Sequence, residues 1–147
     1  MVKKRWRDIQ VGSIVRVDND QAIPSDILIL CTSDAKGQSY VETKNLDGET
    51  NLKLKQANKD IIEQIRDEKD FPKLAGMIIC EKPNNLLYKF EGQMTLGSGK
   101  TISLNADNLM LRGCQLRNTD YVYGITVFQG PDTKIMRNSA KPKYKFS

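Results

Sequence analysis

The apolar residues of this chain come in short runs, each about the length of a β-strand, separated by turn residues. The longest run has five apolar residues in succession, over residues 27–31. A continuous run that short, with Pro24 and Ser25 before it, predicts a buried strand. Because similar runs recur along the chain, the pattern favours a β sandwich or barrel-like fold. Further strands are expected over residues 11–17, 39–41, 76–80, 86–90, 93–96, 100–104, 109–111, 114–116 and 121–128.

One segment has a helical period instead. Residues 58–69 place Ile61, Ile62 and Ile65 among charged residues, a spacing typical of a short amphipathic helix. Asn58 is a good N-cap residue, because its side-chain oxygen can accept a hydrogen bond from the first N–H groups of the helix. The chain is therefore expected to be mainly β with one short helical insertion.

Length and charge restrict the classes of function. The chain has 147 residues, which suits one domain with a single core. Its 23 basic and 18 acidic residues leave a net charge of +5, which permits contact with an anionic surface without demanding nucleic acid. No apolar stretch approaches the roughly 18 residues that span a membrane. The charged N-terminus is not followed by the apolar stretch of a signal peptide.

The absence of histidine and the spacing of the cysteines remove several chemistries. Without His there is no Ser-His-Asp triad, no Cys-His dyad and no His-ligated zinc. Cys31, Cys80 and Cys114 are far apart and lie in or beside apolar stretches, so they are expected to be small core residues. They fit a reducing compartment better than a disulfide scaffold.

Residues 97–101 look like the end of a phosphate-binding P-loop. The motif requires a glycine five residues before Gly99, and that position holds Met94. A P-loop must also open a helix, whereas residues 101–104 alternate like a strand. A hairpin turn is expected here instead.

Residues 43–53 are the most unusual segment in composition, with only two leucines among polar, charged and glycine residues. Locally this composition predicts a turn, in which Gly48 allows a positive φ and removes side-chain bulk from the tip. Glu49 would then project from a loop whose backbone can approach another surface closely. A carboxylate in that position can orient a water molecule or accept its proton. Composition alone supports the turn and leaves the catalytic role open.

The sequence Asp47-Gly48-Glu49-Thr50 resembles the signature loop of the actuator domain of P-type ATPases. Its context over residues 45–53 is similar to the lipid-flippase branch, the P4 subfamily, whereas ion-pumping branches usually carry Thr-Gly-Glu here. Four further blocks resemble that family in the same order, at residues 6–12, 23–30, 111–119 and 130–138. Five ordered blocks make the resemblance specific, whereas one short motif would be weak.

The resemblance implies a fold and a place in a larger enzyme. The fold would be mainly β, a distorted jelly roll or double-stranded β-helix-like sandwich with a short helical insertion. Residues 1–147 would form one domain, with an actuator core over about 6–138 and a basic linker toward a membrane helix over 139–147. The parent would be an ATP-driven phospholipid translocase of a eukaryotic membrane, with this domain on the cytosolic face. Since the chain has no Asp-Lys-Thr-Gly phosphorylation motif, the isolated domain is not expected to hydrolyse ATP.

The resemblance also implies roles for the loop residues. Glu49 would orient and activate the water that hydrolyses an aspartyl phosphate, and Gly48 would let the backbone come close to that phosphate. Asp47 and Thr50 would shape the loop and its docking contacts. No metal or cofactor is expected in this domain, because Mg²⁺ and ATP would be held elsewhere in the parent. No function is carried onto residues 56–108, which have no sharp motif.

The implied partners are the phosphorylation and nucleotide-binding domains and the membrane helices of the same polypeptide, with an accessory β subunit and a phospholipid bound elsewhere. Nucleic acid is not expected. Two alternatives stay open: the actuator domain of a cation-transporting P-type ATPase, and a stand-alone anion- or lipid-binding β domain that uses Lys53, Lys55 and the C-terminal lysines. A nucleic-acid-binding barrel is disfavoured because the aromatic residues mostly fall on strand patterns typical of a core. These residues are Trp6, Tyr40, Tyr88, Phe90, Tyr121, Tyr123 and Phe128.

Overall fold

Short antiparallel strands and a few short helices make up the computed structural model, which describes residues 4–8, 14–65, 69–70, 77–81, 85–96, 99–129 and 133–140. The strands are β1 (Lys4–Asp8), β2 (Ile14–Asp18), β3 (Asp26–Thr32), β4 (Gln38–Glu42), β5 (Leu52–Gln56), β6 (Met77–Glu81), β7 (Glu91–Thr95), β8 (Thr101–Asn105), β9 (Leu109–Met110), β10 (Gln115–Arg117) and β11 (Tyr121–Phe128). The helices are α1 (Lys44–Asp47), α2 (Lys59–Gln64), the 3-10 turn η3 (Ala106–Asn108) and α3 (Lys134–Ala140).

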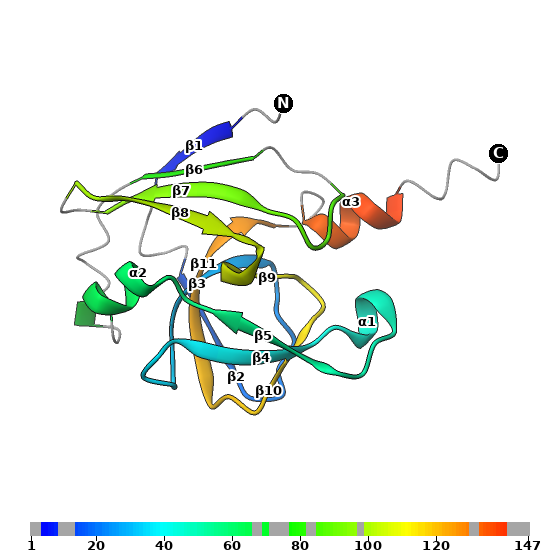
Figure 1. The fold of residues 1–147 in the computed structure, drawn as a ribbon. Helices are drawn as coiled ribbons and strands as arrows, with labels where there is room; N and C mark the ends of the chain where they lie inside the picture. Colours follow the sequence, from blue (N-terminus) through cyan, green and yellow to red (C-terminus); the bar gives the residue numbers. More distant parts are fainter. Residues whose placement is uncertain are drawn as a thin grey trace.

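The strands form three sheets, ordered β1-β6-β7-β8, β10-β4-β5 and β2-β11-β3-β9. Every pairing between them is antiparallel. In Figure 1 the first sheet lies across the top of the view and the other two lie below it. The predicted mainly β fold class is confirmed, and its antiparallel sheets are consistent with a sandwich.

The core is built on β3, whose residues are all buried, as its continuous apolar run predicts. β11 pairs with β3 and shifts register between Tyr123 and Gly124. A Cβ atom at Gly124 would lie 2.8 Å from Ile27 Cδ1 and 2.9 Å from the Leu28 carbonyl oxygen. The two central strands therefore approach each other most closely where β11 carries no side chain.

The predicted strands are confirmed within the described residues, most with ends shifted by one or two residues, except over residues 86–90, where the prediction is wrong. Residues 11–13 and 76 of two predicted strands lie outside the described part of the chain. The segment 86–90 is a turn, and β7 begins only at Glu91. Leu86 and Tyr88 are 47% and 49% exposed, whereas Phe90 is buried, so the apolar residues here do not line one face of a strand. The predicted hairpin before β8 is confirmed, with the Gly99 N–H donating to the Leu96 carbonyl at 2.8 Å.

The helical insertion is also confirmed. The Asn58 side chain accepts a hydrogen bond from the Asp60 N–H at 2.8 Å, and Ile61 and Ile65 are buried. The helix ends earlier than predicted, at Gln64, and residues 66–68 lie outside the described part of the chain.

Helix α3 was not predicted. It includes residues 139–140, which the sequence assigns to a linker. The rest of that predicted linker, residues 141–147, lies outside the described residues, so the division into core and linker stays a prediction.

The cysteine prediction is confirmed at Cys31 and Cys114, which are buried, and the aromatic prediction is confirmed in part. Phe90, Tyr123 and Phe128 are buried, and Tyr121 is half-buried against the core. Tyr40 and Tyr88 are exposed, contrary to the core-like pattern that their positions indicated. The side chains of Trp6 and Cys80 lie outside the described part of the chain.

A buried carboxylate joins three distant parts of the chain. Asp26, at the start of β3, is fully buried. Its Oδ1 accepts a hydrogen bond from the Arg112 N–H at 2.9 Å, and its Oδ2 accepts one from the Lys134 N–H at 2.7 Å. Burial raises the pKa of this carboxyl, and the two N–H donors oppose that rise. Three of the sequence blocks that resemble P-type ATPases therefore meet at one side chain.

Candidate functional site

Residues 43–51 form the loop that connects β4 to β5, and Figure 1 shows its helix α1 beyond the paired ends of these two strands. The segment begins as one helical turn rather than the simple turn predicted. Gly48 ends α1 with a φ of 76°, and its N–H donates to the Lys44 carbonyl at 2.8 Å. Apart from Gly48 and its two chain neighbours, no described residue has an atom within 4 Å of a Cβ built at Gly48. The predicted positive φ and open space at the tip are therefore confirmed.

Asp47 is the main hydrogen-bond acceptor of the loop. Its Oδ1 accepts from the Glu49 N–H at 2.9 Å, and the Thr43 hydroxyl lies 3.0 Å and 3.2 Å from its two oxygens. The Tyr88 hydroxyl donates to Oδ2. The Tyr88 hydroxyl first, and then the Glu49 N–H, hold the pKa of the Asp47 carboxyl below its usual value. The carboxylate therefore joins the start, the tip and a distant segment.

Glu49 presents its carboxylate to solvent. Its side chain is 53% exposed, and its Oε1 lies 2.8 Å from Lys53 Nζ. The Glu49 carboxylate raises the pKa of Lys53. Because both side chains are well exposed, the pair is screened by solvent and contributes little to stability. Glu49 can therefore exchange Lys53 for another partner at small cost, while its backbone stays fixed by Asp47.

A second turn, which contains Gly113, contacts the loop and supports it. Asn45 Nδ2 donates to the Gly113 carbonyl at 3.3 Å. Gly113 has a φ of 92°, and a Cβ there would lie 3.2 Å from Leu46 Cδ1. The neighbouring Arg112 N–H is the one that Asp26 binds. The loop thus rests on a turn that is itself attached to the core.

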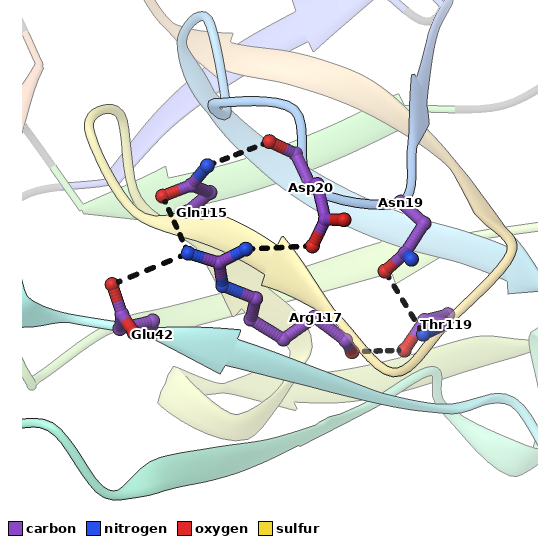
Figure 2. Close-up of polar contacts among 6 residues, drawn as sticks. All are labelled: Asn19, Asp20, Glu42, Gln115, Arg117 and Thr119. Carbon is purple, nitrogen blue, oxygen red and sulfur yellow. Dashed lines mark hydrogen bonds and ion pairs between the residues drawn. The ribbon is translucent and has the colours of Figure 1, made fainter.

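Charged side chains also hold the strand that leads into the loop, as Figure 2 shows. Arg117 Nη1 lies 2.6 Å from Asp20 Oδ1, and its Nη2 lies 3.2 Å from Gln115 Oε1 and 3.7 Å from Glu42 Oε1. The Thr119 hydroxyl donates to the Arg117 carbonyl at 2.8 Å. Glu42 is the last residue of β4, so this cluster ties the entrance of the loop to β10 and to the turn after β2.

A pocket of about 490 Å³ lies beside the loop. Lys55 is partly buried there and donates to the Ala106 carbonyl at 2.9 Å, and burial lowers its pKa. Burial raises the pKa of the Cys114 thiol to about 11. The pocket is lined by Thr43, Asp47, Glu49, Leu52, Lys53, Leu54, Lys55, Tyr88, Ala106, Asp107, Leu111 and Cys114.

The structure brings Asp47, Gly48 and Glu49 together in one hydrogen-bonded tip and leaves Thr50 exposed beside them. Sequence analysis missed Tyr88, because its place among apolar residues suggested a strand. The turn residues Asn84 and Asn85 before it and Lys89 after it were the signal that this segment is a loop.

The described residues contain no cluster of three or more Asp, Glu or Cys side chains that could hold a metal ion. Within the same residues, no helix is both long enough and apolar enough to cross a membrane.

Comparison with known proteins gives a consistent result. The chain is 43% identical over 143 residues to phospholipid-transporting ATPase IC of Xenopus tropicalis, and 44% identical over 144 residues to phospholipid-transporting ATPase DRS2 of Saccharomyces cerevisiae. It is also 44% identical over 144 residues to probable phospholipid-transporting ATPase 12 of Arabidopsis thaliana. These matches cover 97–98% of this chain and 10–12% of the other proteins. No protein-family model matches the chain.

The chain is therefore related to the P-type ATPases. Within them it corresponds to one segment of the phospholipid-transporting ATPases, the P4 branch, and spans about a tenth of the length of the relatives named above. The resemblance drawn from the sequence blocks is confirmed at this level.

Proposed function

We propose that this chain is the actuator domain of an ATP-driven phospholipid-translocating P-type ATPase. Its loop Asp47-Gly48-Glu49-Thr50 promotes hydrolysis of an aspartyl phosphate carried by another domain of the same polypeptide. The observation that carries the proposal is the Glu49 carboxylate, which is 53% exposed on a tip whose backbone Asp47 holds. The similarity to phospholipid-transporting ATPases supplies the substrate class.

The proposed hydrolysis requires the loop mainly to position a water molecule. Hydrolysis of an acyl phosphate requires a water molecule in line with the leaving carboxylate, and catalysis consists mainly of alignment and charge stabilisation. The exposed Glu49 carboxylate can accept a hydrogen bond from that water and take its proton as the bond to phosphorus forms. The open space at Gly48 lets the backbone approach the phosphate, and the exposed Thr50 is placed to contact the phosphorylated domain.

The proposal extends to the rest of the parent enzyme. Mg²⁺ and ATP are proposed to be held by the phosphorylation and nucleotide-binding domains of the parent, as the similarity to phospholipid-transporting ATPases suggests. The parent is a multi-pass membrane protein of a eukaryotic cell, with this domain on the cytosolic face. Rotation of the domain inserts the loop and couples hydrolysis to lipid movement through the membrane helices. An accessory β subunit is a further proposed partner.

The test is Glu49→Gln in the full-length ATPase that contains this segment. The amide keeps the shape of the side chain but cannot take a proton, so phosphoenzyme should form normally from ATP and then decay about 10²–10⁴-fold more slowly. The matched control is Glu63→Gln, the same chemical change at an exposed position of α2. Decay of Glu49→Gln at the rate of the Glu63→Gln control would show that Glu49 has no such role.

The alternative of a stand-alone anion- or lipid-binding domain depends on Lys53, Lys55 and the C-terminal lysines, and the C-terminal lysines lie outside the described residues. Lys53 is paired with Glu49, and Lys55 is hydrogen-bonded to the Ala106 carbonyl. The relatives named above are phospholipid-transporting enzymes, so the phospholipid assignment is preferred over a cation-transporting pump.

A further inference from the structure

We propose that Tyr88 is a positioning residue for the loop, acting through Asp47 on the backbone of Glu49. The inference rests on the proposed function and adds to it a residue from a segment that carries no recognisable motif. Tyr88 lies in the turn between β6 and β7, 41 residues along the chain from Asp47, and its hydroxyl donates to Asp47 Oδ2.

The two carboxylate oxygens of Asp47 bind different partners, one distant in the sequence and one in the same loop. Oδ2 accepts the Tyr88 hydroxyl, whereas Oδ1 accepts the Glu49 N–H at 2.9 Å. Both oxygens are also within reach of the Thr43 hydroxyl, which belongs to the same loop. Hydrogen bonds from a neutral donor to a carboxylate are among the stronger ones in proteins. Tyr88 therefore fixes the rotation of the carboxylate, and the carboxylate fixes the backbone of the residue proposed to align water.

The segment that carries Tyr88 is itself attached to the core. Asn138 Nδ2 on α3 donates to the Asn85 carbonyl at 3.0 Å. At the other end of the segment, the buried Phe90 ring packs edge-on against Phe128 of β11, with ring centroids 6.4 Å apart. The segment that carries Tyr88 is thus attached at both ends, although Tyr88 itself is 49% exposed.

Loss of the hydroxyl should affect the loop and little else. In Tyr88→Phe the ring remains, and Asp47 keeps only the partners of its own loop, so its carboxylate can rotate and the tip becomes less ordered. Reactions that depend on alignment are sensitive to small displacements. We expect phosphoenzyme decay to slow about tenfold, which corresponds to about 1.4 kcal/mol in the barrier. Phosphoenzyme formation, which does not use this loop, should be unchanged.

The experiment compares Tyr88→Phe with Tyr40→Phe in the full-length ATPase that contains this segment. Tyr40 is a second exposed tyrosine, on β4 and outside the lining of the pocket beside the loop, and its variant should decay at the normal rate. Asp47→Asn and the double variant Tyr88→Phe/Asp47→Asn are measured in parallel. Because Tyr88 acts through Asp47, the double variant should decay no more slowly than Asp47→Asn alone, a result that a separate structural role would not produce.

The outcomes separate this inference from the proposed function. Slow decay of Glu49→Gln with normal decay of Tyr88→Phe would overturn the role of Tyr88 and leave the role of Glu49 standing. Normal decay of Glu49→Gln would overturn both. Additive effects in the double variant, or slower formation together with a lower melting temperature for Tyr88→Phe, would assign Tyr88 to folding rather than to positioning and overturn the inference.

Discussion

Replacement of Gly48 by alanine tests the loop most directly, because a second glycine of the chain provides its control. Gly48 and Gly99 have φ values of 76° and 93°. Beyond the chain neighbours, no described residue has an atom within 4 Å of a Cβ built at either position. Alanine therefore meets a similar backbone penalty at both positions and no clash with the described residues beyond its chain neighbours. Gly48 lies at the tip of the proposed catalytic loop, whereas Gly99 closes the hairpin between β7 and β8.

The expected magnitudes follow from the similar backbone conformations of Gly48 and Gly99. Placing an L-residue in the left-handed region costs about 1–2 kcal/mol, so each variant should destabilise the folded chain by a similar amount. For a chain of this size that corresponds to a fall in melting temperature of roughly 2–8 °C. The functional effect should differ, because a methyl group at Gly48 prevents close approach of the loop, and a displacement of about 1 Å can cost roughly 100-fold in rate.

Two assays separate stability from function. Thermal unfolding of the 147-residue chain should give nearly equal shifts for Gly48→Ala and Gly99→Ala. Phosphoenzyme decay in the full-length ATPase that contains this segment should slow about 10- to 100-fold for Gly48→Ala alone. Equal decay rates for the two variants would refute the argument that Gly48 permits close approach. Unequal melting temperatures would refute the argument that both positions bear the same strain.

Two further predictions concern buried groups. Asp26→Ala leaves the Arg112 and Lys134 N–H groups without this acceptor and should lower the unfolding free energy by about 2–4 kcal/mol, as measured by urea denaturation; a loss below 1 kcal/mol would contradict it. Cys114 has a folded pKa of about 11, above its usual value, so only the unfolded state ionises between about pH 9 and 11. Its contribution to stability should therefore be lost as pH rises through that window, by about 1 kcal/mol at pH 10. The unfolding free energy of Cys114→Ala should decline less steeply with pH than that of the wild type. Equal slopes would exclude the assignment of this decline to Cys114.

Much of the fold could be predicted because its strands depend on local patterns. Every residue of the run 27–31 is buried, so the run is continuously apolar. Residues 101–104 alternate between polar and apolar side chains, because only one face of β8 is buried. Helix α2 could be predicted from Asn58 and the spacing of Ile61 and Ile65, which together determine its start and its buried face.

The failures occur where the surroundings, and not the local sequence, determine the conformation. Residues 86–90 have strand-like composition, but Tyr88 is directed to the Asp47 carboxylate and Phe90 to the core, so they do not share one face. Helix α3 begins where Asp26 accepts the Lys134 N–H, an acceptor 108 residues away that no local pattern indicates.

The same reasoning explains how much of the candidate site could be found. Gly48 could be predicted because a positive φ is a local requirement, and Glu49 because it follows that glycine at an exposed tip. Asp47 could be assigned to loop shape only through the resemblance, since its acceptor role involves Thr43, Glu49 and Tyr88 together. Tyr88 could not be found from either source, because one long-range hydrogen bond leaves no period or motif in the sequence.

The contacts of Asp26 connect stability to the loop in a way that the loop sequence alone does not reveal. Its carboxylate holds the Arg112 N–H, and the next residue, Gly113, accepts the hydrogen bond from Asn45 and packs against Leu46. Loss of the carboxylate should therefore loosen the turn on which α1 rests as well as weaken the core. Since no residue of that path is among those proposed to approach the phosphate, Asp26→Ala should slow phosphoenzyme decay only as far as the loop is displaced. In Asp26→Ala the unfolding free energy and the rate of phosphoenzyme decay should therefore both fall. In Glu49→Gln only the rate of phosphoenzyme decay should fall.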